Sequence, residues 1–75
     1  MNPGDLVTFR VVDYVWLCDR PDTSRSIPHD QVMIVVEVTT VLSRTLVLFL
    51  LPDGRLGERH YAPSDQLDTF LRVVC

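Results

Sequence analysis

The stretch QVMIVVEVTTVLSRTLVLFLL, residues 31–51, decides the fold of this chain. Its first part, 31–42, is dense in β-branched residues, which lose rotamer freedom in a helix and suit a pleated strand. Its last part, 45–51, contains an unbroken apolar run, and Ser43-Arg44 between the two parts has the character of a short turn. The stretch therefore predicts two neighbouring strands and a mainly β fold.

Both predicted strands carry apolar residues on both of their faces. A small sheet covers a core with one face and meets solvent with the other, so half of these side chains are expected outside. If Leu46, Leu48 and Leu50 point inward, the outward set is Met33, Val35, Val47, Phe49 and Leu51. The opposite parity is equally allowed. The outward set is covered either by other segments of the chain or by another protein, and burial is worth about 1.5–3 kcal/mol for each side chain.

Upstream of this stretch, the sequence predicts one or two short strands and a long loop. Residues 6–12 follow the turn signal Pro3-Gly4 and alternate between apolar and polar, and residues 14–18 extend the pattern beyond Asp13. Residues 19–30, DRPDTSRSIPHD, combine prolines with aspartates and serines, which favour turns. A loop this long is more often functional than a short connection, and it offers the carboxylates of Asp19, Asp22 and Asp30 as a contact surface.

Downstream, the sequence predicts a hairpin and a closing segment. Pro52-Asp53-Gly54 is a turn in which proline presets the first corner and glycine accepts a positive φ, and residues 55–61 form the return strand. Ser64, followed by Asp65, has the character of a helix start. Residues 65–72 fit either a helix or a strand, and we prefer one helical turn that leads into a final strand over 70–74.

These motifs, taken together, resemble the SH3-like barrels. The matching features are the opening Gly4-Asp5-Leu6-Val7, the long polar loop, the Val-rich strand 32–38, the 52–54 hairpin and the turn before a closing strand. The resemblance covers nearly the whole chain and implies a small barrel of about five strands with a short helical turn near the C-terminus. Small tailed-phage proteins often have this form. The resemblance implies docking onto other proteins, in a virion or a host cytoplasm, and implies no enzymatic activity.

Composition limits the remaining classes of function. Seventy-five residues make one domain, 1–75, near the lower size limit for a self-standing core. We expect no secretory signal and no membrane-spanning helix, since the longest apolar run is Leu46 to Leu51. Cys18 and Cys75 are then expected to be reduced thiols in a cytoplasmic setting, although a bridge between them stays open. The net charge of −3 lacks the basic excess of a nucleic-acid-binding protein.

Three chemical readings of the side chains are weaker than the docking reading. Cys18, His29 and Asp30 are a conceivable nucleophilic set, but nothing in their spacing brings them together. Zinc sites usually take ligands in pairs two to four residues apart, whereas Cys18, His29, His60 and Cys75 are all widely separated. Nucleic-acid stacking would use Tyr14, Trp16, Phe49 and Tyr61, with phosphates meeting Arg10, Arg44 and Arg59. We expect no cofactor, no metal and no small-molecule substrate.

The sequence therefore favours a non-enzymatic module that oligomerises or docks on a larger assembly, such as a phage structural or accessory protein. The first alternative is a small acidic regulator that binds a host or cognate enzyme through loop 19–30. The second is a weak binder of single-stranded nucleic acid.

Overall fold

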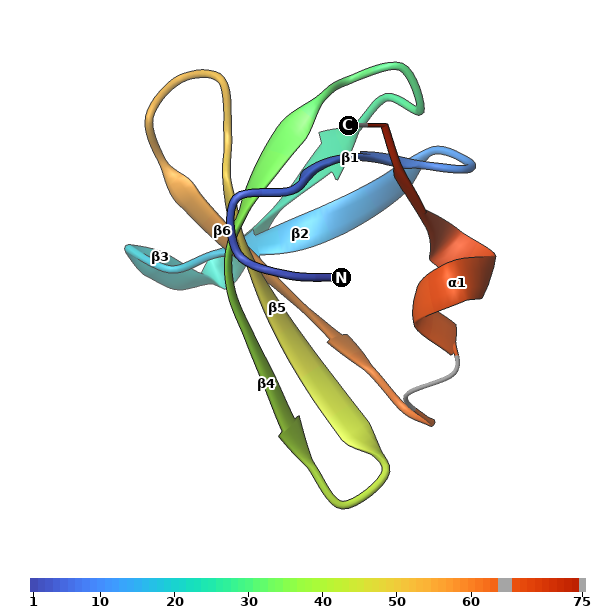
Figure 1. The fold of residues 1–75 in the computed structure, drawn as a ribbon. Coiled ribbons are helices and arrows are strands. Elements are labelled where there is room, and N and C mark those ends of the chain that lie inside the picture. Colours follow the sequence, from blue (N-terminus) through green and yellow to red (C-terminus); the bar gives the residue numbers. More distant parts are fainter. Residues whose placement is uncertain (64–65, 75) are drawn as a thin grey trace.

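The fold is a single antiparallel sheet that curls around a small core, as the computed structural model shows for residues 1–63 and 66–74 (Figure 1). Seven strands and one short helix follow in the order β1 (Leu6–Phe9), β2 (Asp13–Leu17), β3 (Arg20–Ile27), β4 (Met33–Val41), β5 (Arg44–Leu50), β6 (Leu56–Tyr61), α1 (Gln66–Phe70) and β7 (Leu71–Val73). The strand order across the sheet is β3-β2-β6-β5-β4-β1-β7. The prediction of a mainly β chain is confirmed, but the sheet has seven strands instead of about five and is not closed, since β3 and β7 form its two edges.

The core lies on the inner face of the sheet, and every strand contributes at least one buried apolar side chain to it. Val7 and Phe9 come from β1, and the ring of Phe9 meets the ring of Phe49 edge to face at 5.9 Å. The full buried apolar set is Val7, Phe9, Val15, Leu17, Ile27, Met33, Val35, Val47, Phe49, Leu51, Tyr61 and Leu71. This single cluster draws on all seven strands and on Leu51, which follows β5.

The predicted loop 19–30 is wrong over most of its length, because residues 20–27 form β3. Its prolines and polar side chains disfavour a central strand, yet they are tolerated at a sheet edge, where one side of the backbone faces solvent. β3 pairs with β2 only, from Asp13 opposite Ile27 to Leu17 opposite Arg20. The local composition was therefore overridden by pairing with one neighbouring strand.

The outward set predicted for β4 and β5 is also wrong. Met33, Val35, Val47, Phe49 and Leu51 are all between 0% and 2% exposed and belong to the core. The opposite parity holds, so alternate residues of β5 from Leu46 to Leu50 point away from the core and are half-buried. Strict parity also fails within β4, because a bulge between Val35 and Glu37 shifts the register. After a bulge the faces exchange, and Val38 consequently packs against the core.

The C-terminal segment combines the two alternatives left open by the sequence. One helical turn, α1, runs directly into β7, which pairs with β1 and places Val73 opposite Val7. The preferred form of this prediction is confirmed, while the proposed cap at Ser64 and the acid Asp65 lie outside the described residues. In the part of the chain that the structure describes, no helix is long and apolar enough to cross a bilayer.

Candidate functional site

The outward side chains of β4, β5 and β6 form one surface, which we call the outer face. The ladders set its members side by side in cross-strand rows. Ile34, Leu50 and Leu56 form the first row, and β1 extends it with Leu6 opposite Ile34. Along β5 the next rows are centred on Leu48 and Leu46. In order, the rows of the outer face are Ile34–Leu50–Leu56, Glu37–Leu48–Glu58, Thr39–Leu46–His60 and Val41–Arg44.

Apolar side chains dominate the centre of the outer face. Ile34 and Leu56 are each 40% exposed, and the three outward leucines of β5, Leu46, Leu48 and Leu50, are half-buried. Val36, at the bulge, is 42% exposed. On the far side of β6, Trp16 of β2 lies opposite Glu58 and borders the same surface. Aliphatic side chains that neighbouring strands expose together make this surface a candidate interaction site.

Charged and polar groups lie to either side of the central leucines. Glu37 and Glu58 flank Leu48 from β4 and β6, so the second row carries two carboxylates. The third row has His60 beside Leu46, and Arg44 lies at the end of the hairpin. The acidic and basic groups therefore lie in different rows, one above the other along the strands.

An open groove lies at the first-row end of the outer face. It has a volume of about 420 Å³, and its walls are Leu6, Gln31, Val32, Ile34, Leu50, Leu51, Pro52 and Gly54. Most of this lining is aliphatic. Val32 is 41% exposed, so the apolar wall of the groove is open to solvent. A groove of this volume has room for a large aliphatic side chain.

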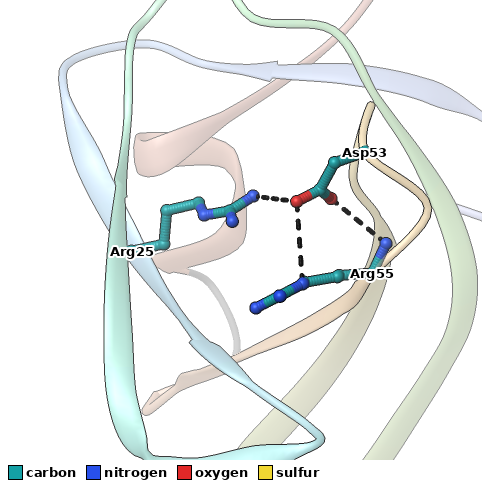
Figure 2. Close-up of polar contacts among 3 residues, drawn as sticks. All are labelled: Arg25, Asp53 and Arg55. Carbon is teal, nitrogen blue, oxygen red and sulfur yellow. Dashed lines mark hydrogen bonds and ion pairs between the residues drawn. The ribbon is translucent and has the colours of Figure 1, made fainter.

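A polar clasp fixes the turn that forms one wall of the groove (Figure 2). Asp53 accepts a hydrogen bond of 2.6 Å from the guanidinium of Arg25 on β3 and one of 3.1 Å from the backbone N–H of Arg55. Arg25 and then the Arg55 amide hold the pKa of the Asp53 carboxyl below its usual range. The clasp ties the edge strand β3 to the turn between β5 and β6, which carries Pro52 and Gly54.

The opposite end of the outer face is the tip of the β4–β5 hairpin, which extends from the body of the molecule in Figure 1. Val41 pairs with Arg44, so Leu42 and Ser43 alone form the turn. Leu42 has a φ of 57° and a side chain that is 95% exposed. A left-handed conformation costs a leucine about 1–2 kcal/mol and is normally taken by glycine or asparagine. A strained and fully exposed leucine is the least expected residue at this position.

The three aspartates of the acidic-loop prediction do not form one surface. Asp22 is an exposed residue within β3, whereas Asp19 precedes this strand and Asp30 follows it. An eight-residue strand separates the ends by about 25 Å. Asp30 instead borders a groove of about 410 Å³ that also contains His29, Arg10 and Arg72.

The conceivable nucleophilic and metal sets are not assembled either. Cys18 follows β2 and His29 follows β3, so they lie at opposite ends of the β2–β3 hairpin. Slight burial, and then the charges of Glu58 and Asp19, raise the pKa of the Cys18 thiol, which disfavours the reactive thiolate. Among residues 1–63 and 66–74 no group of three candidate ligands could hold a metal ion. Cys75, and with it the question of a bridge to Cys18, lies outside the described residues.

The side chains of the nucleic-acid reading are divided between surface and interior. Phe49 and Tyr61 are buried, while Tyr14 and Trp16 are 39% and 36% exposed and meet edge to face. Arg59, one of the three predicted phosphate contacts, points inward. Two of the four rings are therefore closed to a base.

Arg59 instead forms an internal ion pair. Its Nη2 lies 3.3 Å from Oδ1 of Asp13, with side chains 19% and 10% exposed. The guanidinium lies over the ring of Tyr14 at 4.1 Å. Burial raises the pKa of the nearby Tyr61 hydroxyl, and the Asp13 carboxylate raises it further. This cluster joins β2 to β6 and serves the fold.

Comparison with protein-family models, curated proteins and solved structures finds no match to this chain.

Proposed function

We propose that this chain is a non-enzymatic protein-binding module that docks through the outer face of β4, β5 and β6. The observation that carries the proposal is the aliphatic row Ile34–Leu50–Leu56, continued along β5 by Leu48 and Leu46. This surface is built on paired strands and needs no rearrangement to meet a partner. Docking on it therefore costs little conformational entropy.

The energetics of a small domain support the same proposal. A chain of this length buries only about 60% of the surface that its unfolded form exposes, and its stability is correspondingly small. Fully burying an exposed large aliphatic side chain contributes about 1.5–3 kcal/mol, and a half-buried one gains about half of that. Covering the three leucines of β5 together with Ile34 and Leu56 would thus add several kcal/mol, a large part of the stability of a small domain.

The likeness to SH3-like barrels supports the wider setting of the proposal. The likeness rests on motifs of the sequence: the opening Gly4-Asp5-Leu6-Val7, the Val-rich strand 32–38 and the 52–54 hairpin. On this likeness the chain would be an open, seven-stranded relative of the SH3-like barrel. Its assembly would be a tailed-phage virion or a complex in the host cytoplasm.

The experiment compares Leu48→Glu with the matched control Val12→Glu. Val12 is 61% exposed in the connection between β1 and β2 and belongs to none of the rows of the outer face, so both variants place one carboxylate at an aliphatic surface position. Solution mass is measured by light scattering over a concentration series, and the binding of an apolar-surface dye is measured at the lowest concentration. We expect association or dye binding in the wild type, its loss in Leu48→Glu and its retention in Val12→Glu. A monodisperse wild-type monomer that binds no dye would contradict the proposal.

A further inference from the structure

We infer that the outer face binds a second copy of this chain, in a two-fold dimer in which each Leu42 enters the other copy's apolar groove. The inference rests on the proposed docking function of the outer face and names its partner. It follows from three features of one surface: an exposed knob at one end of β5, a groove at the other end, and charges that complement each other only in one arrangement.

The knob and the groove cannot meet within one molecule. Leu42 precedes β5, whereas the groove is lined by Leu50 at the end of β5 and by Leu51 just beyond it. The seven residues of this strand span about 23 Å, so a single copy holds the knob and the groove far apart. Consider a two-fold axis that lies in the interface between the two copies, perpendicular to β5 and level with Val47. This axis makes the two β5 strands antiparallel, so the knob of each copy meets the groove of the other.

The cross-strand rows determine which groups then meet. With the axis at the level of Val47, each Leu46 lies over Leu48 of the other copy, and the fourth row lies over the first. Val41 then lies over Ile34, and Leu42, one residue further, reaches Val32 at the groove. Leu46 of each copy thereby meets Leu48 of the other, and Ile34 meets Val41, while Arg44 lies over Leu50 and can cover it with its aliphatic stem.

The charged side chains favour the axis perpendicular to β5 over an axis parallel to it. The perpendicular axis places Glu58 of each copy over His60 of the other, so a carboxylate meets an imidazole N–H donor twice in the dimer. A two-fold axis parallel to β5 would instead place Glu58 over Glu37, since these two residues flank Leu48 on either side. Like charges in direct opposition across an interface are strongly unfavourable. The face is therefore complementary to itself in the antiparallel arrangement alone.

The conformation of Leu42 fits this role. Glycine or asparagine at this turn position would remove the strain of the left-handed backbone. The position instead holds a leucine whose side chain is almost fully exposed in the single chain. Insertion into a groove would bury this side chain. Strain retained at one exposed position points to a contact made outside the single chain.

The size of the surface also fits a specific dimer. An ordinary specific interface covers about 800 Å² on each partner, which is about a sixth of the 4645 Å² of this chain. The two longest extents of the molecule are 30 and 27 Å, so one face together with the hairpin tip can supply such an area. A contact of this size with two knob-and-groove pairs is sufficient for a defined dimer.

The test uses opposite charges placed on the knob and in the groove. Leu42→Glu and Val32→Arg are each expected to weaken dimerisation about tenfold or more, because each variant loses both knob-and-groove contacts. An equimolar mixture of the two variants should restore it, since the mixed dimer has one wild-type contact and one Glu–Arg contact. Dimerisation is measured by sedimentation equilibrium, and Val12→Arg in place of Val32→Arg is the control. This control should dimerise as the wild type does and should not rescue Leu42→Glu.

Each outcome separates this inference from the docking proposal. Loss in both single variants with recovery in the mixture, at the mass of a dimer, supports the two-fold arrangement. A wild-type dimer that Leu48→Glu disrupts but that neither Leu42→Glu nor Val32→Arg weakens would overturn it and leave docking through the outer face in place. A wild-type monomer with dye bound at the outer face would overturn the second copy as partner. Masses that grow beyond a dimer would overturn the two-fold axis, because a knob-and-groove contact that does not close forms chains.

Discussion

Replacing Leu42 by asparagine should make the isolated domain more stable while it weakens self-association. The side chain is 95% exposed, so the single chain loses no buried contact when it is shortened. The backbone has a φ of 57°, which costs an ordinary residue about 1–2 kcal/mol and which asparagine accepts with little strain. We therefore expect Leu42→Asn to raise the free energy of unfolding by about 1 kcal/mol. For a domain of this size that shift corresponds to about 4–8 °C in Tm.

The assay is urea unfolding of dilute protein, at concentrations where association contributes nothing. Leu42→Ala is the matched control, because alanine removes the exposed side chain and keeps the cost of the left-handed backbone. We expect the alanine variant to be about as stable as the wild type, and both variants to dimerise about tenfold or more weakly than the wild type. An asparagine variant no more stable than the alanine variant would refute the strain argument.

The remaining predictions concern the core, the internal ion pair and the clasp. Gly57→Ala should lower the free energy of unfolding by about 1–3 kcal/mol in urea titrations, because its new Cβ would lie 2.7 Å from Cγ2 of the stiff Val15 side chain. An alanine variant as stable as the wild type would contradict this close approach. Arg59→Leu should lower the free energy of unfolding by about 3 kcal/mol, because it leaves the Asp13 carboxylate buried without its ion-pair partner. The double variant Asp13→Leu/Arg59→Leu should recover most of that stability. Equal destabilisation in the single and the double variant would argue against the ion pair. Asp53→Asn should destabilise the chain at neutral pH but not in acid. The folded-state pKa of Asp53 is lowered, so its contribution is full above the ordinary value of about 3.9 and is lost as the pH falls through the lowered one. Unfolding curves of wild type and Asp53→Asn that stay equally far apart at pH 7 and in strong acid would exclude the linkage.

The β4–β5 hairpin could be predicted from sequence because composition and pattern agreed there. β-branched residues dominate 32–41, and a turn separates them from the apolar run that ends at Leu51. Local preference and tertiary pairing point to the same structure in this stretch. The return strand β6 and the helical turn before β7 were predictable for the same reason.

The parity of the hairpin could not be predicted, and this was the decisive point for the site. Both faces of β5 are aliphatic, so alternation carries no signal that distinguishes inside from outside. The bulge between Val35 and Glu37 exchanges the faces of β4 without glycine or another local mark. The five residues predicted as the contact surface therefore lie in the core, and Ile34, Leu48 and Leu50 take their place outside.

The edge strand β3 was missed for a different physical reason. Its residues favour turns one by one, and only the ladder with β2 and the Arg25–Asp53 contact compensate. The ladder with β2 is local, but the turn-favouring composition of residues 19–30 conceals it. The Arg25–Asp53 contact joins residues 28 positions apart, so a window of neighbouring residues contains no information about it.

The central claim, that the outer face is covered by another copy of the chain, is tested most directly by the fluorescence of Trp16. It is the only tryptophan in the sequence, is 36% exposed and lies opposite Glu58 at the border of the outer face. Its emission is measured over a dilution series of the wild type and of Leu48→Glu. We predict a blue-shifted emission in the wild type that moves to the red on dilution, and a red emission at every concentration in Leu48→Glu. Emission that is independent of concentration and identical in the two proteins would contradict the claim.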